Sequence, residues 1–175
     1  MDKDFQEVLF QSQTHGALGI DDIINTIKTF LEEDPESQYS LVIGTDSHEK
    51  ISEKKSSNGT RDINLVTAVL IHRKGFGGKY FWLRREVPNI HNLREKIYTE
   101  TMASLNFATF FVPLFRKNLN GHSPKYDLEI HVDVGEHGDT REMIKEIVGM
   151  VTGNGFVAKT KPEAYAASYV ADKHT

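Results

Sequence analysis

The spacing of hydrophobic residues changes along the chain, and each spacing predicts a different kind of element. Between residues 20 and 31, apolar side chains recur every three or four positions, which is typical of one face of an α-helix. Apolar runs over residues 39–46, 64–72 and 79–87 have the length of strands. Polar or glycine-rich segments without helical spacing separate these runs, so we expect three consecutive antiparallel strands.

Helices and strands alternate in the rest of the chain, after Pro88 ends the three-strand pattern. Asn92 is a suitable N-terminal cap for a long helix that reaches about residue 116. The pattern then predicts a strand over residues 126–134, a helix capped by Asp139 and Thr140, a strand over residues 156–160 and a last helix from Pro162 to about residue 172.

The order of these elements, α-βββ-α-β-α-β-α, predicts the class of fold. Three antiparallel strands followed by alternating helix and strand units indicate an α/β fold, with a mixed five-stranded sheet, helices on both faces and an additional N-terminal helix. Residues 1–18 are polar and weakly patterned, so we expect an extended lead-in there. The length of 175 residues suits one domain spanning residues 1–175.

Composition narrows the class of protein without naming an activity. Hydrophobic residues make up 38% and charged residues 26% of the chain, as in ordinary globular proteins. No run approaches the roughly 18 apolar residues that cross a bilayer. The N-terminus lacks the layout of a secretory signal, so we expect no membrane partner and a cytoplasmic location. The lack of cysteine in the sequence excludes disulfides and thiolate zinc sites.

The net charge of −4 gives the chain no global basic field. Nucleic acid as a partner would therefore need a local basic patch or bridging metal ions. The oligomeric state stays open at this stage, because an edge strand of the meander could pair with another copy.

Asp46 stands at the end of the first predicted strand, in the segment Tyr39–His48. Buried strands exclude charge unless it is paired or bound to a metal, so an acid at the mouth of a strand is a common metal ligand. The alternative is that Asp46 only begins a turn. The choice depends on whether other acids meet it.

Glu100 lies on the apolar side of the long helix. Helical spacing places it between Ile97 and Ser104 on an inward-facing stripe, whereas Glu95 falls on the polar side. The alternative is that Glu100 simply pairs with Lys96 one turn earlier.

Asp133 ends the fourth predicted strand, as Asp46 ends the first. Glu129, His131 and Asp133 alternate with apolar residues and so share one face. If this strand runs parallel to the first, both aspartates emerge at the carboxyl edge, where open α/β sheets usually place their sites. The alternative is a turn that Asp133 begins together with Gly135.

Asp172 ends the last predicted helix. A carboxylate at a helix C-terminus opposes the helix dipole, and a bound metal would compensate for this. A disordered tail would remove the conflict altogether. Glu163, near the start of the same helix, is a rival for the role of fourth acid.

Together, Asp46, Glu100, Asp133 and Asp172 form a candidate catalytic and metal-binding set contributed by two strands and two helices. Hard cations such as Mg²⁺ or Mn²⁺ prefer oxygen ligands and need several acids to offset their charge. Two such ions about 4 Å apart can activate water and stabilise the leaving oxygen in phosphodiester cleavage. The four acids therefore predict a two-metal site.

The same acids lie in motifs that resemble a known family. The element order, with acids on these elements, resembles the ribonuclease H-like superfamily, and the chain is more closely similar to its bacterial YkuK family. The matching stretches span roughly residues 20–174 and read Ile43-Gly-Thr-Asp-Ser47, Glu95-Lys-Ile-Tyr-Thr-Glu100, His131-Val-Asp-Val-Gly-Glu-His-Gly-Asp-Thr-Arg141 and Lys161-Pro-Glu-Ala-Tyr-Ala-Ala-Ser-Tyr-Val-Ala-Asp172.

This resemblance implies a function and a role for each acid. The superfamily pattern maps onto Asp46, Glu100, Asp133 and Asp172 as metal ligands, and His174 is interpreted as a tail residue. The leading hypothesis is a metal-dependent nuclease acting on RNA, DNA or a hybrid. The alternative is a non-catalytic module of the same fold that binds nucleic acid or protein.

The segment Asp133–Thr140 also suits phosphate binding, because two glycines precede a helix N-terminus. It resembles the phosphate loop of actin-like ATPases, whose core is related to ribonuclease H. Those ATPases enclose a nucleotide between two such domains, and the length of this chain suits only one.

Further residues carry weaker signals, each with a structural alternative. Histidines near the expected edge can ligate a metal or serve the fold. Basic pairs can follow a phosphate backbone or be solvated, and aromatic residues on the third strand can stack on bases or fill the core. The residues concerned are His48, His131 and His137; Lys54, Lys55, Arg61, Arg84 and Arg85; and Phe76, Tyr80 and Trp82.

Overall fold

A mixed sheet with helices packed against it forms the structure, a computed structural model that describes residues 3–50, 60–119, 125–135, 140–164, 169–170 and 173–174. The elements are α1 (Lys3–Gln6), β1 (Phe10–Ser12), β2 (Gly16–Leu18), α2 (Ile20–Glu32), β3 (Tyr39–Glu49), β4 (Arg61–Arg73), β5 (Gly77–Ile90), α3 (Leu93–Asn118), β6 (Tyr126–His131), a 3₁₀ turn η1 (Arg141–Met143), α4 (Ile144–Gly153) and β7 (Val157–Lys159).

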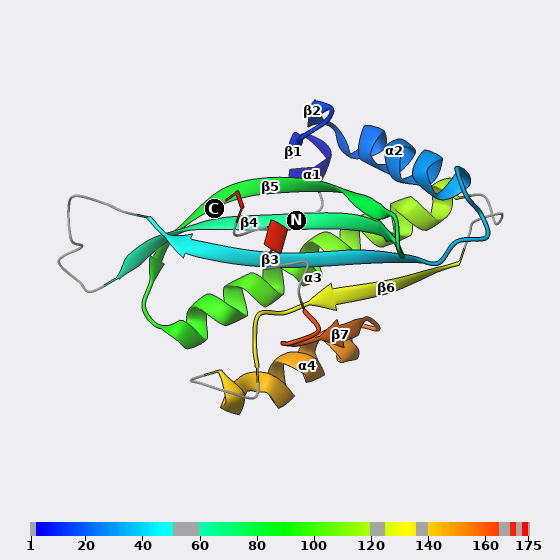
Figure 1. The fold of residues 1–175 in the computed structure, drawn as a ribbon. Coiled ribbons are helices and arrows are strands. Elements are labelled where there is room, and N and C mark those ends of the chain that lie inside the picture. The colour runs from blue at the N-terminus through cyan, green and yellow to red at the C-terminus, as the bar shows by residue number, and fades with distance from the viewer. Residues whose placement is uncertain are drawn as a thin grey trace.

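The sheet has the strand order β2-β1-β5-β4-β3-β6-β7 (Figure 1). The strands β3, β4 and β5 pair antiparallel, whereas β6 runs parallel to β3 and β7 parallel to β6. The predicted α/β fold, with its antiparallel meander and parallel units, is therefore confirmed. Because β3 and β6 are parallel, their carboxyl ends reach the same edge of the sheet.

The strand count was predicted wrongly at the N-terminus. Residues 1–18 were expected to form an extended lead-in, but β1 and β2 form a short hairpin, and β1 pairs with β5 through Gln11 and Trp82. The sheet consequently has seven strands instead of five. Each of these strands has three residues, which is too short for the alternation of apolar and polar positions to be recognised.

The boundaries of the long strands also differ from those predicted. The strands β3 and β4 extend beyond their apolar runs, and β5 continues through Pro88 to Ile90. The ladder between β4 and β5 is irregular near this proline, and Asn89 adopts a positive φ of 63°. A bulge suits proline, which has no N–H for a regular ladder. In contrast, β6 ends at His131, so Asp133 lies just beyond the strand.

The helices α2 and α3 cover the sheet with apolar faces. The buried face of α2 consists of the isoleucines and leucine at the predicted helical spacing together with Phe30. On α3, Phe107, Phe111 and Phe115 are fully buried one turn apart and stack on one another. Both helices contribute to one apolar core with β3, β4 and β5. In Figure 1, α3 (green) crosses the sheet and α4 (orange) lies beside β7.

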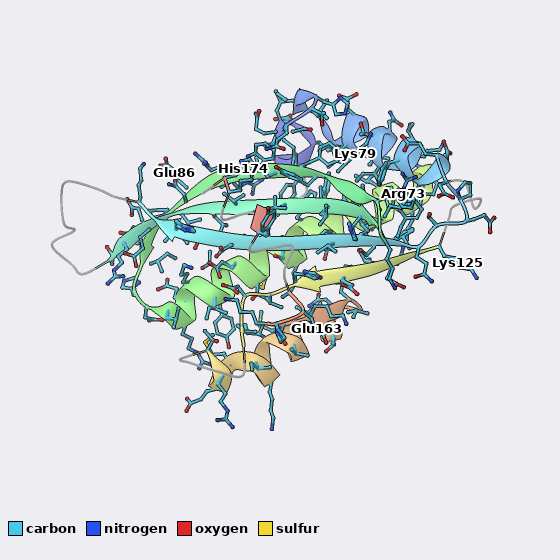
Figure 2. The ribbon with its side chains drawn as sticks, in the orientation of Figure 1. Arg73, Lys79, Glu86, Lys125, Glu163 and His174 are labelled. Carbon is cyan, nitrogen blue, oxygen red and sulfur yellow. The ribbon has the colours of Figure 1, made fainter. Side chains whose placement is uncertain are left out.

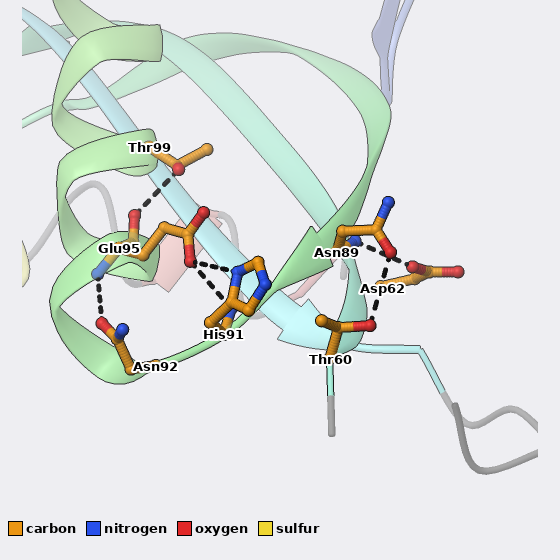
Figure 3. Close-up of polar contacts among 7 residues, drawn as sticks. All are labelled: Thr60, Asp62, Asn89, His91, Asn92, Glu95 and Thr99. Atoms are coloured by element: carbon orange, nitrogen blue, oxygen red, sulfur yellow. Dashed lines mark hydrogen bonds and ion pairs between the residues drawn. The ribbon is translucent and has the colours of Figure 1, made fainter. Parts of the chain in front are cut away.

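The start of α3 matches its prediction in detail. The side chain of Asn92 accepts a hydrogen bond from the backbone N–H of Glu95 at 2.9 Å, which makes Asn92 the N-terminal cap. The Glu95 carboxylate accepts hydrogen bonds from the backbone N–H of His91 at 2.8 Å and lies 3.0 Å from its ring (Figure 3). Glu95 therefore serves the helix start and, as expected, faces away from the core.

The last helix was predicted to run from Pro162 to about residue 172, but residues 162–164 are not helical, and residues 161–163 form a turn. Tyr169 and Val170 are helical. Tyr169 is exposed and Val170 is buried. Asp139, predicted as a helix cap, and Asp172 lie outside the described residues. Within the described part of the chain, no helix is both long and apolar enough to cross a membrane.

Candidate functional site

Asp46 lies in the buried part of β3, close to where that strand leaves its partner β6. The pairing of β3 with β6 ends at Gly44, two residues before Asp46, while the pairing with β4 continues. Asp46 is only 5% exposed, and its carboxylate accepts a hydrogen bond from the backbone N–H of Ser47 at 2.7 Å. The aspartate is therefore a buried charge, not an ordinary turn residue at a strand end.

Glu100 approaches the same place from α3. It is 4% exposed, and its Oε1 atom accepts a hydrogen bond from the Ser47 hydroxyl at 2.7 Å. The ammonium of Lys96 lies 2.9 Å from the same oxygen and 3.8 Å from Asp46 Oδ1. Both interpretations left open by the sequence are thus correct: Glu100 faces inward, and it also pairs with Lys96.

Burial dominates the electrostatics of this pair. Burial raises the pKa of Glu100 to about 7 from its ordinary 4.5, although Lys96 and the Ser47 hydroxyl act in the opposite direction. For Lys96, burial lowers the pKa, but attraction to Glu100, and then to Asp46 and Asp133, outweighs burial and leaves that pKa raised. Burial is therefore the largest influence on Glu100, and the neighbouring carboxylates keep the ammonium of Lys96 protonated.

Asp133 reaches the site from the segment that follows β6. The backbone N–H of Val132 donates to Lys159 at 3.0 Å, and the N–H of Lys161 donates to Val134 at 2.9 Å. These bonds continue the alignment of the two segments that follow β6 and β7. They bring the Lys161 ammonium to 2.6 Å from Asp133 Oδ1. A Cβ atom at Gly135 would lie 3.2 Å from the Lys161 Cβ, so glycine permits the close approach.

Buried hydroxyl groups connect α3 with the strands beneath the acids. The hydroxyl of Ser104 lies 2.9 Å from that of Thr45, which in turn lies 3.0 Å from the hydroxyl of Thr67 on β4. All three residues are buried. Such a connected network fixes the position of the helix on the sheet.

A cavity of about 320 Å³ opens above these residues, lined by Leu93, Lys96, Ile97, Glu100, Asp133, Gly135, Thr140 and Lys161. A neighbouring cavity of about 210 Å³ shares Leu93 and Lys96 with it and continues toward Arg61 and His91. A larger cavity of about 680 Å³ lies elsewhere along α3, and its lining includes none of the three described acids of the site. Glu100 and Asp133 therefore face a recess, and a second cavity with basic side chains in its lining adjoins it.

The fourth acid is not placed by the described residues. Asp172 lies outside them. Its rival Glu163 lies 3.1 Å from Lys159 with an exposed side chain, and it is not among the residues that line the cavity of the three acids (Figure 2). The choice between Asp172 and Glu163 stays a prediction.

The weaker signals fall in different places. His131 is buried, lies 3.0 Å from Glu129, and has a pKa lowered by burial. His48 is exposed at the end of β3, whereas His137, Lys54 and Lys55 lie outside the described residues. Arg61 forms an ion pair with Glu49 beside the smaller cavity.

The aromatic and basic residues of β5 serve other contacts. Trp82 stacks on the ring of His174 at 3.6 Å between centroids, and Tyr80 lies beside both rings. Arg84 donates a hydrogen bond to the backbone carbonyl of His174, whose position beside β5 is shown in Figure 2. His174 was interpreted as a tail residue, but its ring and its carbonyl contact β5, and it does not line the cavity of Glu100 and Asp133.

The contacts of Phe76 and Arg85 are separate from this group. Phe76 is exposed and lies under the guanidinium of Arg73. The guanidinium of Arg85 lies over the ring of Phe5. Neither residue lines the cavity of the acids.

Sequence reasoning missed two groups of residues in the site. Ser47 and Thr45 flank Asp46 in the same motif, and their burial could have been inferred from the length of the strand. The role of Lys161 carried no local signal, because it depends on a backbone alignment with Val134. Lys96 was considered only as an ion-pair partner of Glu100, in the alternative that gave Glu100 no role in metal binding.

Comparisons with known proteins agree with the predicted class of fold. A family model described as ribonuclease H-like matches residues 22–175, which is most of the chain, so the chain belongs to this family. It is also similar to the uncharacterized protein YkuK of Bacillus subtilis (strain 168), with 31% identity over 175 residues, 95% of this chain and 96% of the relative. Within the ribonuclease H-like class, the chain is therefore a member of the YkuK family. No solved structure matches it.

The donor set fits a hard divalent cation in kind. Three carboxylates reach one small region from a strand, a helix and a loop, and carboxylate oxygens are the ligands that hard divalent cations prefer. In their present spacing, no three acidic or histidine residues of the described part of the chain form a metal-holding group. The ammonium of Lys96 instead occupies the space between Asp46 and Glu100.

Proposed function

We propose that this protein is a divalent-metal-dependent nuclease that hydrolyses phosphodiester bonds of RNA, DNA or a hybrid. The observation that carries the proposal is the approach of three acids to one region: Glu100 and Asp133 line the cavity, and Asp46 lies behind it, 3.8 Å from the ammonium of Lys96 that also contacts Glu100. Membership of the ribonuclease H-like family supports a nuclease or a nucleic-acid-binding module. The finer assignment to a metal-dependent nuclease is ours.

The chain's own residues divide the work in this proposal. Asp46, Glu100 and Asp133, with Asp172 as the predicted fourth ligand, hold Mg²⁺ or Mn²⁺. A bound divalent ion supplies activation of water and stabilisation of the leaving oxygen. Lys161 lines the cavity with an accessible ammonium that would bind a non-bridging phosphate oxygen, and Asp133 beside it would be a ligand of the metal.

The neighbouring cavity of about 210 Å³ offers a path for the nucleic-acid strand next to the cleaved bond. It joins the site at Leu93 and Lys96 and is also lined by Arg61 and His91. A guanidinium and an imidazole at this distance along the groove suit phosphate contacts that position a strand without reading its sequence. This cavity adds basic side chains to the ammonium groups of the site, and Arg61 also pairs with Glu49 there.

A second candidate is a non-catalytic nucleic-acid-binding module. It is favoured by the pairing of Lys96 with Glu100 and of Lys161 with Asp133, since these ion pairs neutralise the carboxylates without a metal. In this case the cavity would bind phosphate through its lysines, and no cleavage would follow.

Cleavage of a nucleic-acid panel tests the proposal. End-labelled single-stranded RNA and DNA, both duplexes and an RNA–DNA hybrid are incubated with the protein in MnCl₂ or in chelator. We expect cleavage of at least one substrate in Mn²⁺ and a return to the protein-free level for Asp46→Asn, which keeps the size of the side chain and removes its charge.

The matched control is Asp127→Asn, because Asp127 is an exposed acid on β6 and does not line the cavity. This variant should cleave like the wild type. Nucleic acid bound by fluorescence anisotropy but left intact in saturating Mn²⁺ would support the binding module. Cleavage that survives Asp46→Asn would refute the assignment of the site.

A further inference from the structure

Lys96 occupies an unusual position for a lysine. It lies in the first turns of α3, where the helix dipole disfavours a positive charge, and its side chain is only 26% exposed. Lysine is rarely buried unless it is paired, and here the ammonium meets Glu100 at 2.9 Å and Asp46 at 3.8 Å. The acids of the site therefore hold the ammonium where neither the helix nor solvent would favour it.

The ammonium stands where a metal ion shared by two acids would have to stand. Asp46 comes from a strand and Glu100 from a helix, and Lys96 Nζ is within ion-pair distance of both. Lys96 also lines the same cavity as Asp133. In two-metal nucleases, the ions lie about 3.5–4 Å apart and share such carboxylates. An ammonium in this place excludes one of the two ions by volume and by charge.

The charges of the described site lead to the same result. With every group ionised, three carboxylates (Asp46, Glu100 and Asp133) and two ammonium groups (Lys96 and Lys161) sum to −1. Asp172, the fourth ligand of the proposed function, would make this sum −2, so that one divalent ion would bring it to 0 and two would bring it to +2. Replacing Lys96 by a neutral residue lowers the sum by one and removes the ammonium from its place between Asp46 and Glu100.

We propose that the ammonium of Lys96 replaces one of the two metal ions expected of this fold, so that the site takes a single Mg²⁺ or Mn²⁺. This inference rests on the proposed function, because it assumes a metal at the acids. It revises the two-metal expectation from the sequence. Lys96 is then a permanent cation of the site, which neutralises Glu100 and Asp46 while the single divalent ion binds on the side of Asp133.

The number of bound ions tests this proposal without any measurement of cleavage. MnCl₂ is titrated into the metal-free full chain by isothermal titration calorimetry, and the bound Mn²⁺ is examined by electron paramagnetic resonance. We expect one ion per chain in the wild type, with the six-line spectrum of an isolated Mn²⁺. Lys96→Gln should bind two ions, with a spectrum broadened by coupling between neighbouring ions.

The matched control is Lys161→Gln, which removes the same charge from the same cavity but from the side of Asp133. It should still bind one ion. Two ions in Lys161→Gln as well would overturn the specific role of Lys96, and so would one ion in Lys96→Gln. If Lys96→Gln does not fold, as judged by circular dichroism, Lys96→Met serves in its place, and two ions in the wild type alone would refute the inference.

The outcomes separate this inference from the proposed function. Two ions in the wild type, together with Mn²⁺-dependent cleavage, would overturn the inference and keep the nuclease. Absence of any bound Mn²⁺ in both the wild type and Lys96→Gln would overturn both. One ion in the wild type and two in Lys96→Gln would support the inference whether or not a substrate is cleaved.

Discussion

Replacing Glu100 by glutamine should stabilise the metal-free protein at alkaline pH. Burial raises the pKa of Glu100 to about 7 in the folded chain, against an ordinary value of 4.5. The folded state thus holds this proton more tightly than the unfolded state does. The corresponding stability is fully present below pH 4.5 and is lost as the pH rises through about 7. Glutamine is neutral at every pH and avoids this loss.

The size of the effect follows from the same two values. At about 1.4 kcal/mol per pH unit, the interval from 4.5 to about 7 corresponds to about 3 kcal/mol. The carboxylate is 5% exposed, so solvent screening reduces this figure little. We expect Glu100→Gln to match the wild type near pH 4 and to exceed its unfolding free energy by about 3 kcal/mol at pH 8.

Urea unfolding followed by circular dichroism, in chelator and at several pH values, measures this difference. Glu142→Gln is the control, because Glu142 is an exposed acid and its replacement should change the unfolding free energy little at any pH. Mn²⁺ should then offset most of this difference. A ligand at 100 times its Kd stabilises the folded state by about 2.7 kcal/mol, and the variant should gain less than the wild type. A difference that stays constant from pH 4 to pH 8 would refute the reasoning.

Three other substitutions test contacts around the site and at the end of the chain. Ser47→Ala removes the hydroxyl that donates to Glu100 at 2.7 Å and should lower the unfolding free energy by about 1–3 kcal/mol at pH 8; an unchanged urea midpoint would contradict this. Asn92→Ala removes the cap of α3 and should lower it by about 1 kcal/mol, again measured in urea. His174→Ala uncovers one face of Trp82, the only tryptophan in the sequence, and should shift its fluorescence to longer wavelength; Lys173→Ala should not.

The sequence was informative where a local pattern determines the environment of a residue. An apolar run that ends in Asp46 and a helical stripe that contains Glu100 both predicted buried acids, and both are buried. The parallel alignment of β3 and β6 was expected from the order of the elements and places Asp133 at the same edge. These predictions succeeded because period and order are set by neighbours along the chain.

The sequence was uninformative where a contact depends on distant segments or on very short elements. The approach of Lys161 to Asp133 requires the loop after β6 to align with the loop after β7. The hairpin of β1 and β2 is stabilised by pairing with β5 and by burial of Phe10, neither of which shows in a three-residue pattern. The role of Lys96 lay between these cases, since its spacing from Glu100 predicted the pair but not the contact with Asp46.

The buried hydroxyl groups of Ser104, Thr45 and Thr67 explain why Lys96 is held next to Asp46. Lys96 and Glu100 are one turn apart on α3, so their contact would survive any movement of the helix. The contact with Asp46 would not survive, because Asp46 belongs to β3. The Ser104 hydroxyl bonds to Thr45, the residue next to Asp46, and thereby fixes α3 on β3 at the level of the acids. The core thus determines the place of the ammonium, and a metal ion that needs the same place has to displace a group that the fold itself holds there.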